Sequence, residues 1–161
     1  MELIKITEVN DPLAQMVALF RVELRSYKGI VSEPNVKAGH EEMEEYLSAG
    51  FPVFAALVNG EYAGYVVCRV DSEVVWVESI FVKEEYRRHG VASALHSKAE
   101  EIAASYGEDT VYNYVHPNNH RMIEFLRKRG YTVLNLIEIR KPYEGERFTQ
   151  VISVGNHKFD Y

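Results

Sequence analysis

The stretch "SIFVKEEYRRHGVASAL", Ser79 to Leu95, joins two different sequence patterns. The residues up to Val82 are apolar and rich in β-branched and aromatic types, as in a buried strand. From Val91 onward, small and apolar residues recur at helical spacing. Between the two patterns, the basic run 87–89 precedes Gly90 in a chain that is acidic overall. The stretch therefore predicts a strand, a basic turn and a helix in succession.

The turn between this strand and this helix has the chemistry of an anion site. A helix start leaves four backbone N–H groups without partners and carries about half a positive charge. Gly90 has no Cβ, so a ligand can approach the backbone closely, and Ala92 keeps the neighbouring position small. Basic residues oppose the dipole at this end of a helix, where Asp or Ser would be more stabilising. The turn therefore predicts a diphosphate site, with an exposed basic helix start as the structural alternative.

The remaining segments give a consistent order of elements. We expect Asp11 to cap a first helix that ends at Gly29, and a short second helix over His40–Ala49. The dipeptide Asn59-Gly60 between apolar runs predicts a hairpin. The later elements are strands over 51–58, 61–70 and 73–82, a helix over 91–106, a strand over 110–115, a helix from Asn118 or Asn119 to Arg129, and paired strands over 131–139 and 148–154. This order predicts a mixed sheet with helices on its faces.

Composition limits the class of protein. The 161 residues are 47% apolar and contain no repeat or linker, so we expect one domain over residues 1–161. No stretch approaches the roughly 20 apolar residues of a membrane span, and the first ten residues lack the pattern of a secretory signal. The net charge of −6 argues against a nucleic-acid partner and is compatible with a cationic substrate. The single cysteine, Cys68, excludes an internal disulfide and favours a reducing cytoplasm, and we expect its side chain to be buried.

Two motifs resemble those of the GNAT superfamily of N-acetyltransferases. Arg87-x-x-Gly90-x-Ala92, directly after a strand, is similar to the family's acetyl-CoA motif. The segment "NHRMIEFLRKRGY", Asn119 to Tyr131, is similar to the family's later motif in its asparagine, its apolar pairs and its final glycine–aromatic pair. The resemblance implies a GNAT-like α/β (α+β mixed) fold. Its features are a central, mixed, mostly antiparallel sheet of about seven strands, four flanking helices, and two parallel strands that splay apart in the middle.

The resemblance also implies which residues hold acetyl-CoA. The co-substrate would lie between the splayed strands that carry Val82 and Val115, and the backbone of Ile80, Phe81 and Val82 would pair with its pantetheine arm. The side chain of Asn119 would hydrogen-bond this arm near the thioester. The other expected cofactor residues belong to the basic turn and helix start, where the N–H groups from 88 to 93 would hold the pyrophosphate: Arg87, Arg88, His89, Gly90, Val91, Ala92 and Ser93.

Glu78 is the candidate general base. A primary amine, with a pKa of roughly 10, must lose a proton before it attacks a thioester, and a carboxylate can accept that proton directly or through water. Glu78 lies in an apolar run, where an unpaired charge would be costly, and period-two alternation puts it on one face with Ile80 and Val82. Similar GNAT enzymes that act on small amines carry a carboxylate at this place. The structural alternative is a glutamate at a sheet edge or paired with an arginine.

The sequence leaves the general acid open. Leu126 stands where many GNAT enzymes have a tyrosine that protonates the leaving thiolate, and leucine cannot donate a proton. Tyr131, Tyr114, His116 or Ser79 could replace it, and Tyr131 is the candidate that we count as catalytic. A thiol with a pKa of roughly 8.5 can also leave as the thiolate without help.

Together these features predict an N-acetyltransferase that moves an acetyl group from acetyl-CoA to a primary amine by direct attack. The acceptor would be a small polyamine-like or aminoglycoside-like amine, or a peptide N-terminus or lysine. A non-catalytic acyl-CoA-binding or sensing module of the same fold is the alternative, favoured by Leu126 as the enzyme is favoured by Glu78. We expect no metal site and no membrane or nucleic-acid partner, a surface position for His96, and, by analogy alone, a homodimer with an edge strand from "VISVGNHKFDY".

Overall fold

The computed structural model describes residues 1–161 and divides them into two compact units, Met1–Phe125 and Leu126–Tyr161. The first unit contains a five-stranded sheet, and the second contains a two-stranded sheet. Helix α4 (His120–Lys128) begins in the first unit and ends in the second. None of the helices combines the length and the apolar character that crossing a membrane requires.

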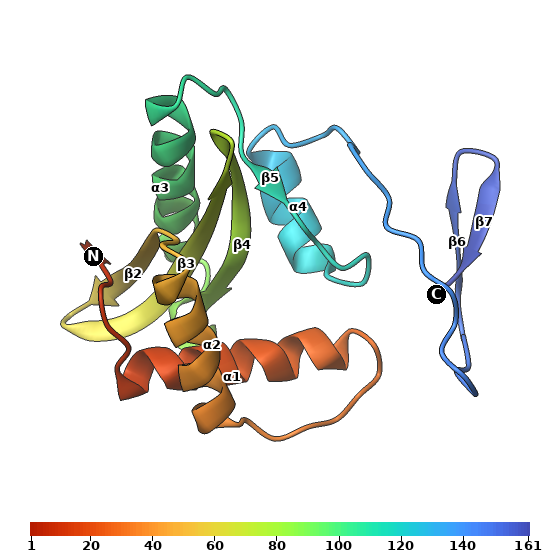
Figure 1. Ribbon diagram of the computed structural model, residues 1–161, viewed down its shortest axis with the longest axis horizontal. Coiled ribbons are helices and arrows are strands. Elements are labelled where there is room, and N and C mark those ends of the chain that lie inside the picture. Colours follow the sequence, from red (N-terminus) through yellow and green to blue (C-terminus); the bar gives the residue numbers. More distant parts are fainter. The chain divides into compact units, whose positions relative to one another are not determined.

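The five-stranded sheet has the strand order β1-β2-β3-β4-β5 (Figure 1). Its strands are β1 (Glu2–Lys5), β2 (Val53–Val58), β3 (Glu61–Asp71), β4 (Val74–Val82) and β5 (Tyr112–Asn113). Neighbouring strands from β1 to β4 are antiparallel, whereas β5 is parallel to β4. The β2–β3 hairpin turns at Asn59-Gly60, with φ angles of 53° and 83°, as the sequence predicts. The predicted mixed, mostly antiparallel sheet is therefore confirmed.

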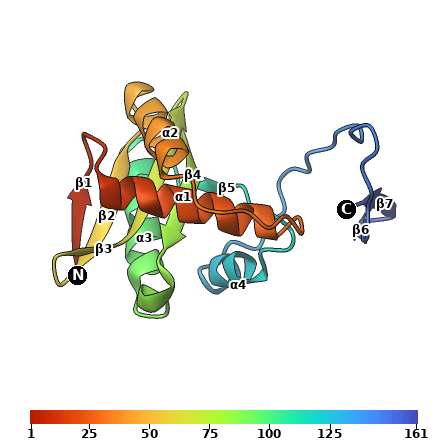
Figure 2. The same ribbon diagram turned by 90° about the horizontal axis from the view of Figure 1, so that it is seen from below.

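Helices cover both faces of this sheet. Helices α1 (Asp11–Ser26) and α2 (Val36–Ser48) lie on one face and α3 (Val91–Ser105) lies on the other (Figure 2). Consecutive residues of β3 show the alternation, because Gly64 lies against Leu95 of α3 while Tyr65 is buried on the opposite face, among residues of α1 and α2. The core cluster on the face covered by α1 and α2 consists of Ile6, Leu13, Met16, Val17, Met43, Val53, Ala55, Tyr65, Val67 and Phe81.

Two helix starts differ from the sequence prediction. The N-cap of α1 is Asn10, whose Oδ1 accepts the N–H three residues on at 3.1 Å, and Asp11 is the first helical residue. The N-cap of α2 is Asn35, which makes the same bond at 3.0 Å, so the predicted start at His40 is too late. In both cases an asparagine provides the cap, because its side-chain oxygen satisfies an N–H group that has no partner within the helix.

Helix α3 agrees with the prediction in its bounds but not in the position of His96. This side chain is fully buried, not on the surface. Its Nε2 lies 3.2 Å from Oδ1 of Asn113 on β5, and its ring packs edge-on against Phe125 with centroids 5.7 Å apart. His96 therefore joins α3 to the short strand at the edge of the sheet.

The second unit contains a hairpin of β6 (Val151–Val154) and β7 (His157–Asp160). The predicted pairing of the strand over 148–154 with its predecessor is wrong, because β6 pairs with the segment that follows it. The predicted strand over 131–139 is not formed, and its apolar side chains are between 46% and 88% exposed: Val133, Leu134, Leu136, Ile137 and Ile139. Period-two alternation shows that a segment suits a strand, but a strand also needs a partner for its backbone groups.

Candidate active site

A gap opens between the two parallel strands of the first unit. Strands β4 and β5 pair only at Trp76↔Tyr112 and Val77↔Asn113, whereas β4 continues to Val82 along β3. From Ser79 onward, the edge of β4 that faces β5 has no strand beside it. The predicted splaying of the parallel strands is therefore confirmed.

A cavity of about 60 Å³ lies at this gap. Its lining comes from α1, β4, the end of β5 with the segment after it, and the start of α4: Phe20, Leu24, Val77 to Ile80, Asn113 to His116, Asn119 and Met122. Three predicted site residues, Glu78, Ile80 and Asn119, thus lie around one cavity although they are far apart in the sequence. Three of the alternative acids, Ser79, Tyr114 and His116, line it as well, so the structure brings base and acid candidates together.

Glu78 occupies a β-bulge in β4. The register passes from Val67↔Ser79 to Cys68↔Val77, which leaves Glu78 as the extra residue without a partner in β3. Its carboxylate bonds to Arg69, and the hydroxyl of Ser79 bonds to Tyr65. Because Arg69 and Tyr65 are four residues apart on one strand, they lie on one face of β3. The bulge therefore turns Glu78 toward the α1–α2 face, and the predicted shared face with Ile80 is wrong.

The Glu78 carboxylate has one strong partner. Nε of Arg69 donates to Oε2 at 3.0 Å, and both side chains are 29% exposed. The guanidinium of Arg69 also lies over the Trp76 ring, 4.4 Å from its centroid. This arrangement fixes the position of the Glu78 side chain at the wall of the cavity. The Arg69 contact also matches the predicted alternative of a glutamate paired with an arginine.

The turn after β4 has the backbone conformation of an open cradle. A short 3₁₀ turn (Glu84–Tyr86) leads to Arg88, which has a positive φ of 65°, and to Gly90, the N-cap of α3, with φ 81°. The first bond of the helix runs from the Ala94 N–H to the Gly90 carbonyl oxygen at 3.0 Å. The N–H groups of residues 91–93 therefore have no partner within the helix.

Space and charge at this turn fit a pyrophosphate. A Cβ added to Gly90 would meet no atom within 4 Å, so the backbone here is open to a ligand. The side chains of Arg88 and His89 are exposed beside it. Backbone donors, a helix start and a neighbouring cation together form a favourable site for a phosphate group. The residues present thus fit the anionic part of acetyl-CoA.

Arg87, the first residue of the motif, is engaged inside the protein. Its Nε donates to the carbonyl oxygen of Val82 at 2.9 Å, and its terminal nitrogen forms an ion pair with Glu23 of α1, also at 2.9 Å. The sequence predicted that the positive charge of Arg87 would face the ligand. Nothing in the sequence indicated that Glu23 of α1 is its partner. Arg87 is therefore placed to organise the turn, whereas Arg88 and His89 are placed to meet an anion.

Asn119 contributes to the cavity and to the start of α4. Its Oδ1 accepts the N–H of Met122 at 3.1 Å, so Asn119 is the cap that the sequence placed at either Asn118 or Asn119. Because its oxygen is used in this way, a bond from Asn119 to a ligand would come from the amide nitrogen as donor. Asn118 donates instead to the backbone oxygen of Tyr27 at 3.0 Å.

The acid candidates differ in what surrounds them. Burial, together with Lys28, lowers the pKa of His116 below its ordinary 6.5, so at neutral pH the ring is uncharged and suits a proton acceptor better than a donor. Ser79 is buried and shares a 2.9 Å hydrogen bond with Tyr65. Tyr114 lines the cavity and is 63% exposed. Tyr131 belongs to the second unit, where its N–H donates to the Leu126 carbonyl oxygen at 3.1 Å.

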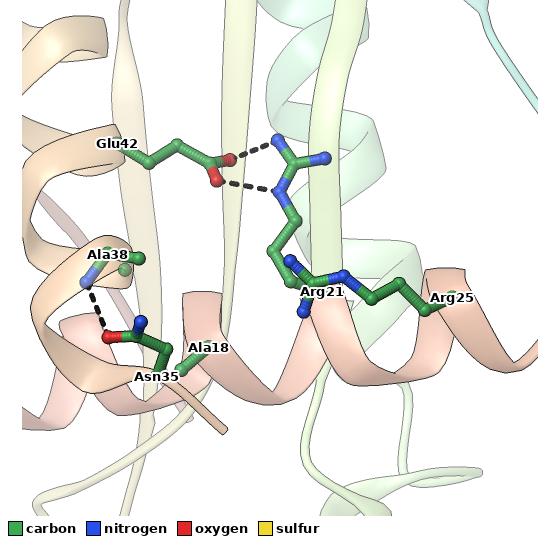
Figure 3. A pocket seen from close by; sticks show the side chains of 7 residues that line it. Ala18, Arg21, Arg25, Asn35, Ala38 and Glu42 are labelled. Atoms are coloured by element: carbon green, nitrogen blue, oxygen red, sulfur yellow. Dashed lines mark hydrogen bonds and ion pairs between the residues drawn. The ribbon is translucent and has the colours of Figure 1, made fainter. Parts of the chain in front are cut away.

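A second cavity, of about 270 Å³, lies between α1 and α2. Figure 3 shows two sets of contacts among its lining residues: the Glu42 carboxylate accepts from the Arg21 guanidinium, and the Asn35 side chain accepts from the Ala38 N–H. This cavity shares no residue with the one at the strand gap. The Arg21–Glu42 ion pair joins the two helices, whereas the Asn35 bond caps α2.

Comparison with known proteins identifies the family. The family model described as "Acetyltransferase (GNAT) family" matches residues 16–131. The chain belongs to the GNAT family of acetyltransferases. The predicted resemblance to the GNAT family is therefore confirmed.

One curated relative is the "Uncharacterized N-acetyltransferase" of Methanocaldococcus jannaschii, which is 33% identical over 85 residues. The alignment covers 48% of this chain, and the chain spans only 38% of the length of that relative. The similarity between the two proteins is therefore limited to a part of each chain.

Solved structures of aminoglycoside acetyltransferases share the fold. AAC(6')-Iy, in complex with the bisubstrate analogue CoA-S-monomethyl-acetylneamine, superposes with a TM-score of 0.65 at 21% identity, over 88% of this chain and 98% of that one. An enzyme from an uncultured soil metagenomic sample gives 0.64 at 15% identity, over 88% and 95%. AAC(6')-IG from Acinetobacter haemolyticus gives 0.63 at 16% identity, over 89% and 99%. At these identities the similarity establishes the GNAT fold.

Proposed function

We propose that this chain is an N-acetyltransferase that uses acetyl-CoA to acetylate a primary amine of a small cationic molecule. The main support is the gap between β4 and β5, which has the Glu78 carboxylate at its wall and follows β4 to the open helix start at Gly90. One strand thus connects a carboxylate suited to an amine with a turn suited to a pyrophosphate.

The residues that would hold acetyl-CoA follow from this arrangement. The unpaired edge of β4 at Ile80, Phe81 and Val82 offers backbone groups to the pantetheine arm in the manner of an added strand. The N–H groups of residues 91–93, with the exposed side chains of Arg88 and His89, bind the pyrophosphate. The amide nitrogen of Asn119 donates to the arm from the opposite wall of the cavity.

The chemistry of the reaction is divided between the ligand and the chain. Bound acetyl-CoA supplies a thioester whose acetyl group is already activated for transfer to an amine. Glu78 accepts a proton from the ammonium group of the acceptor, directly or through a water molecule, at its carboxylate oxygens. Arg69 keeps that carboxylate oriented through the 3.0 Å bond to Oε2. Holding the thioester and the amine next to each other at the gap between β4 and β5 supplies much of the rate, since effective orientation is worth roughly 7 kcal/mol or more in good cases.

The acceptor class rests on charge and on the fold neighbours. The chain carries a net charge of −6, which favours a cationic amine over an anionic one. Three similar structures are described as aminoglycoside acetyltransferases, and one of them was solved with sisomicin bound. We therefore propose a small polyamine-like or aminoglycoside-like amine, with a peptide amine as an alternative outcome of the test. Tyr131 stays a predicted acid, alongside Tyr114, His116 and Ser79.

The test is CoA thiol release with acetyl-CoA and a panel of amines that contains polyamines, aminoglycosides and peptides. We expect release that depends on a small polycationic amine. Glu78→Gln should lower the amine-dependent rate by at least about 100-fold, because general base catalysis contributes roughly 10²–10⁴-fold. Arg69→Gln is the matched control, since it removes the same ion pair and leaves the carboxylate, and it should cost less than about tenfold.

Two results would contradict the proposal. CoA binding without release for any amine would favour the non-catalytic acyl-CoA-binding module, which the pairing of Glu78 with Arg69 and the leucine at position 126 support. Equal losses in Glu78→Gln and Arg69→Gln would show that the ion pair is structural and that Glu78 is not the base.

A further inference from the structure

Glu23 of α1 contacts one arginine from each of the two motifs that carry the family resemblance. Its Oε2 accepts from Arg87 at 2.9 Å and its Oε1 accepts from Arg121 at 2.6 Å. The Glu23 side chain is 22% exposed, compared with 25% for Arg87 and 57% for Arg121. A single carboxylate outside both motifs thus joins the turn before α3 to the first turn of α4.

The Arg87 arm of this contact reaches the end of β4. Besides Glu23, Arg87 donates from Nε to the Val82 carbonyl oxygen at 2.9 Å, and its guanidinium carbon lies 5.8 Å from the centroid of the Phe81 ring. Val82 and Phe81 belong to the strand edge proposed for the pantetheine arm. Arg88 and Gly90 of the pyrophosphate turn come one and three residues after Arg87 in the sequence. Glu23 therefore restrains, through Arg87, the point where the strand edge becomes the pyrophosphate turn.

The Arg121 arm reaches the segment around Asn119. Arg121 lies in the first turn of α4, two residues after Asn119. The end of α1 holds the same segment a second time, because Tyr27 donates to Glu23 Oε1 at 3.1 Å and its backbone oxygen accepts from Asn118 at 3.0 Å. Glu23 is thus the shared point of a network that fixes both proposed binding segments against α1.

We propose that Glu23 is a positioning residue for acetyl-CoA binding, and this proposal rests on the proposed function. It holds Arg87 and Arg121, and through them the pyrophosphate turn and the asparagine at the start of α4, in the binding arrangement before the ligand arrives. Fixing ligand-binding segments in advance increases affinity, because less freedom is lost on binding. Glu23 itself would touch neither acetyl-CoA nor the acceptor.

The sign of the effect distinguishes positioning from simple charge. Glu23 is a negative charge beside two arginines and near a site for an anion. If its charge alone mattered, Glu23→Gln would make the site more positive and would tighten CoA binding. If Glu23 positions the two segments, the same substitution releases both arginines and weakens CoA binding.

The experiment measures the Kd of CoA by calorimetry, the thermal stability, and kcat and KM for acetyl-CoA in wild type and three single variants. Glu23→Gln should weaken CoA binding by about tenfold and raise the KM for acetyl-CoA similarly, with kcat changed by less than about threefold. Glu42→Gln is the matched control, because Glu42 is also a partly buried carboxylate that pairs with an arginine, Arg21 of α1, but contacts neither motif. It should leave the Kd of CoA within about twofold even where it lowers thermal stability.

Arg121→Gln gives an independent check at an exposed position, where the fold tolerates change. It should weaken CoA binding by several-fold, and in the double variant with Glu23→Gln the two losses should not add. Unchanged or tighter CoA binding in Glu23→Gln, or an equal loss in Glu42→Gln, would overturn the positioning role. Wild-type protein that does not bind CoA would instead refute the proposed function, so the two failures are distinguishable.

Discussion

Gly90 and Gly107 occupy the two ends of α3 and form a matched pair for testing the pyrophosphate turn. Gly90 is the N-cap with φ 81°, and Gly107 follows the last turn with φ 83°. An added Cβ would meet no atom within 4 Å at either position. The two glycines thus have the same conformation and the same open surroundings, but only Gly90 lies at the proposed ligand site.

Substitution by alanine should lower the free energy of unfolding by the same amount at both positions. The left-handed conformation costs an L-residue roughly 1–2 kcal/mol, and the reduced freedom of the unfolded chain returns roughly 0.4–1 kcal/mol. The net loss of about 1 kcal/mol corresponds to a fall in Tm of about 2–4 °C for a chain of this size. Scanning fluorimetry without ligand should therefore give similar shifts for Gly90→Ala and Gly107→Ala.

CoA binding should separate the two variants. At Gly90 the new methyl group would stand where the backbone N–H groups face the pyrophosphate, and each hydrogen bond lost to a charged group costs roughly 1.5–3 kcal/mol. Gly90→Ala should therefore weaken CoA binding by about 10- to 100-fold in calorimetry, whereas Gly107→Ala should bind like wild type. If Gly90→Ala binds CoA as tightly as Gly107→Ala, the turn is not the pyrophosphate site.

Three further predictions concern the fold around the site. Tyr65→Phe removes the hydrogen-bond partner of the buried Ser79 hydroxyl, which lies 2.9 Å from the Tyr65 hydroxyl. It should lower the free energy of unfolding by about 1–3 kcal/mol in a urea titration. A loss below about 0.5 kcal/mol would show that this hydrogen bond does not stabilise the fold. Burial raises the pKa of the Cys68 thiol to about 12, so native protein at pH 8 should resist iodoacetamide until it is unfolded, and rapid native alkylation would contradict the buried position. Gly39→Ala should lower the unfolding free energy by about 1–3 kcal/mol, because the added Cβ would collide with the backbone of Ala14 where α2 crosses α1; unchanged stability would contradict this close packing.

The elements with strong local signals were predictable from the sequence. The Asn59-Gly60 hairpin, the strand up to Val82 and the helix from Val91 to Ser105 depend on turn chemistry and periodicity within short windows. The gap between β4 and β5 was predictable only through the family resemblance, since it is a property of two strands that are thirty residues apart.

Other features depend on contacts between distant residues. The bulge at Glu78 arises from pairing with β3, and local alternation therefore placed this side chain on the wrong face. The partner of Arg87 is on α1, 64 residues away, and the burial of His96 depends on Asn113 and Phe125. The sequence shows which residues are polar, but the fold decides which of them bond to one another. The alternating apolar segment over 131–139 has no partner strand, which alternation alone does not supply.

A CoA titration followed by ¹⁵N–¹H correlation spectra tests the proposed site most directly. The backbone amides of Ile80 and Val82 on β4 and of residues 91–93 at the start of α3 should show the largest shifts, since these N–H groups would bond to the ligand. The side-chain amide of Asn119 should shift with them. Shifts confined to the cavity between α1 and α2, around Arg21 and Glu42, or the absence of any shift, would contradict an acetyl-CoA site in the gap between β4 and β5.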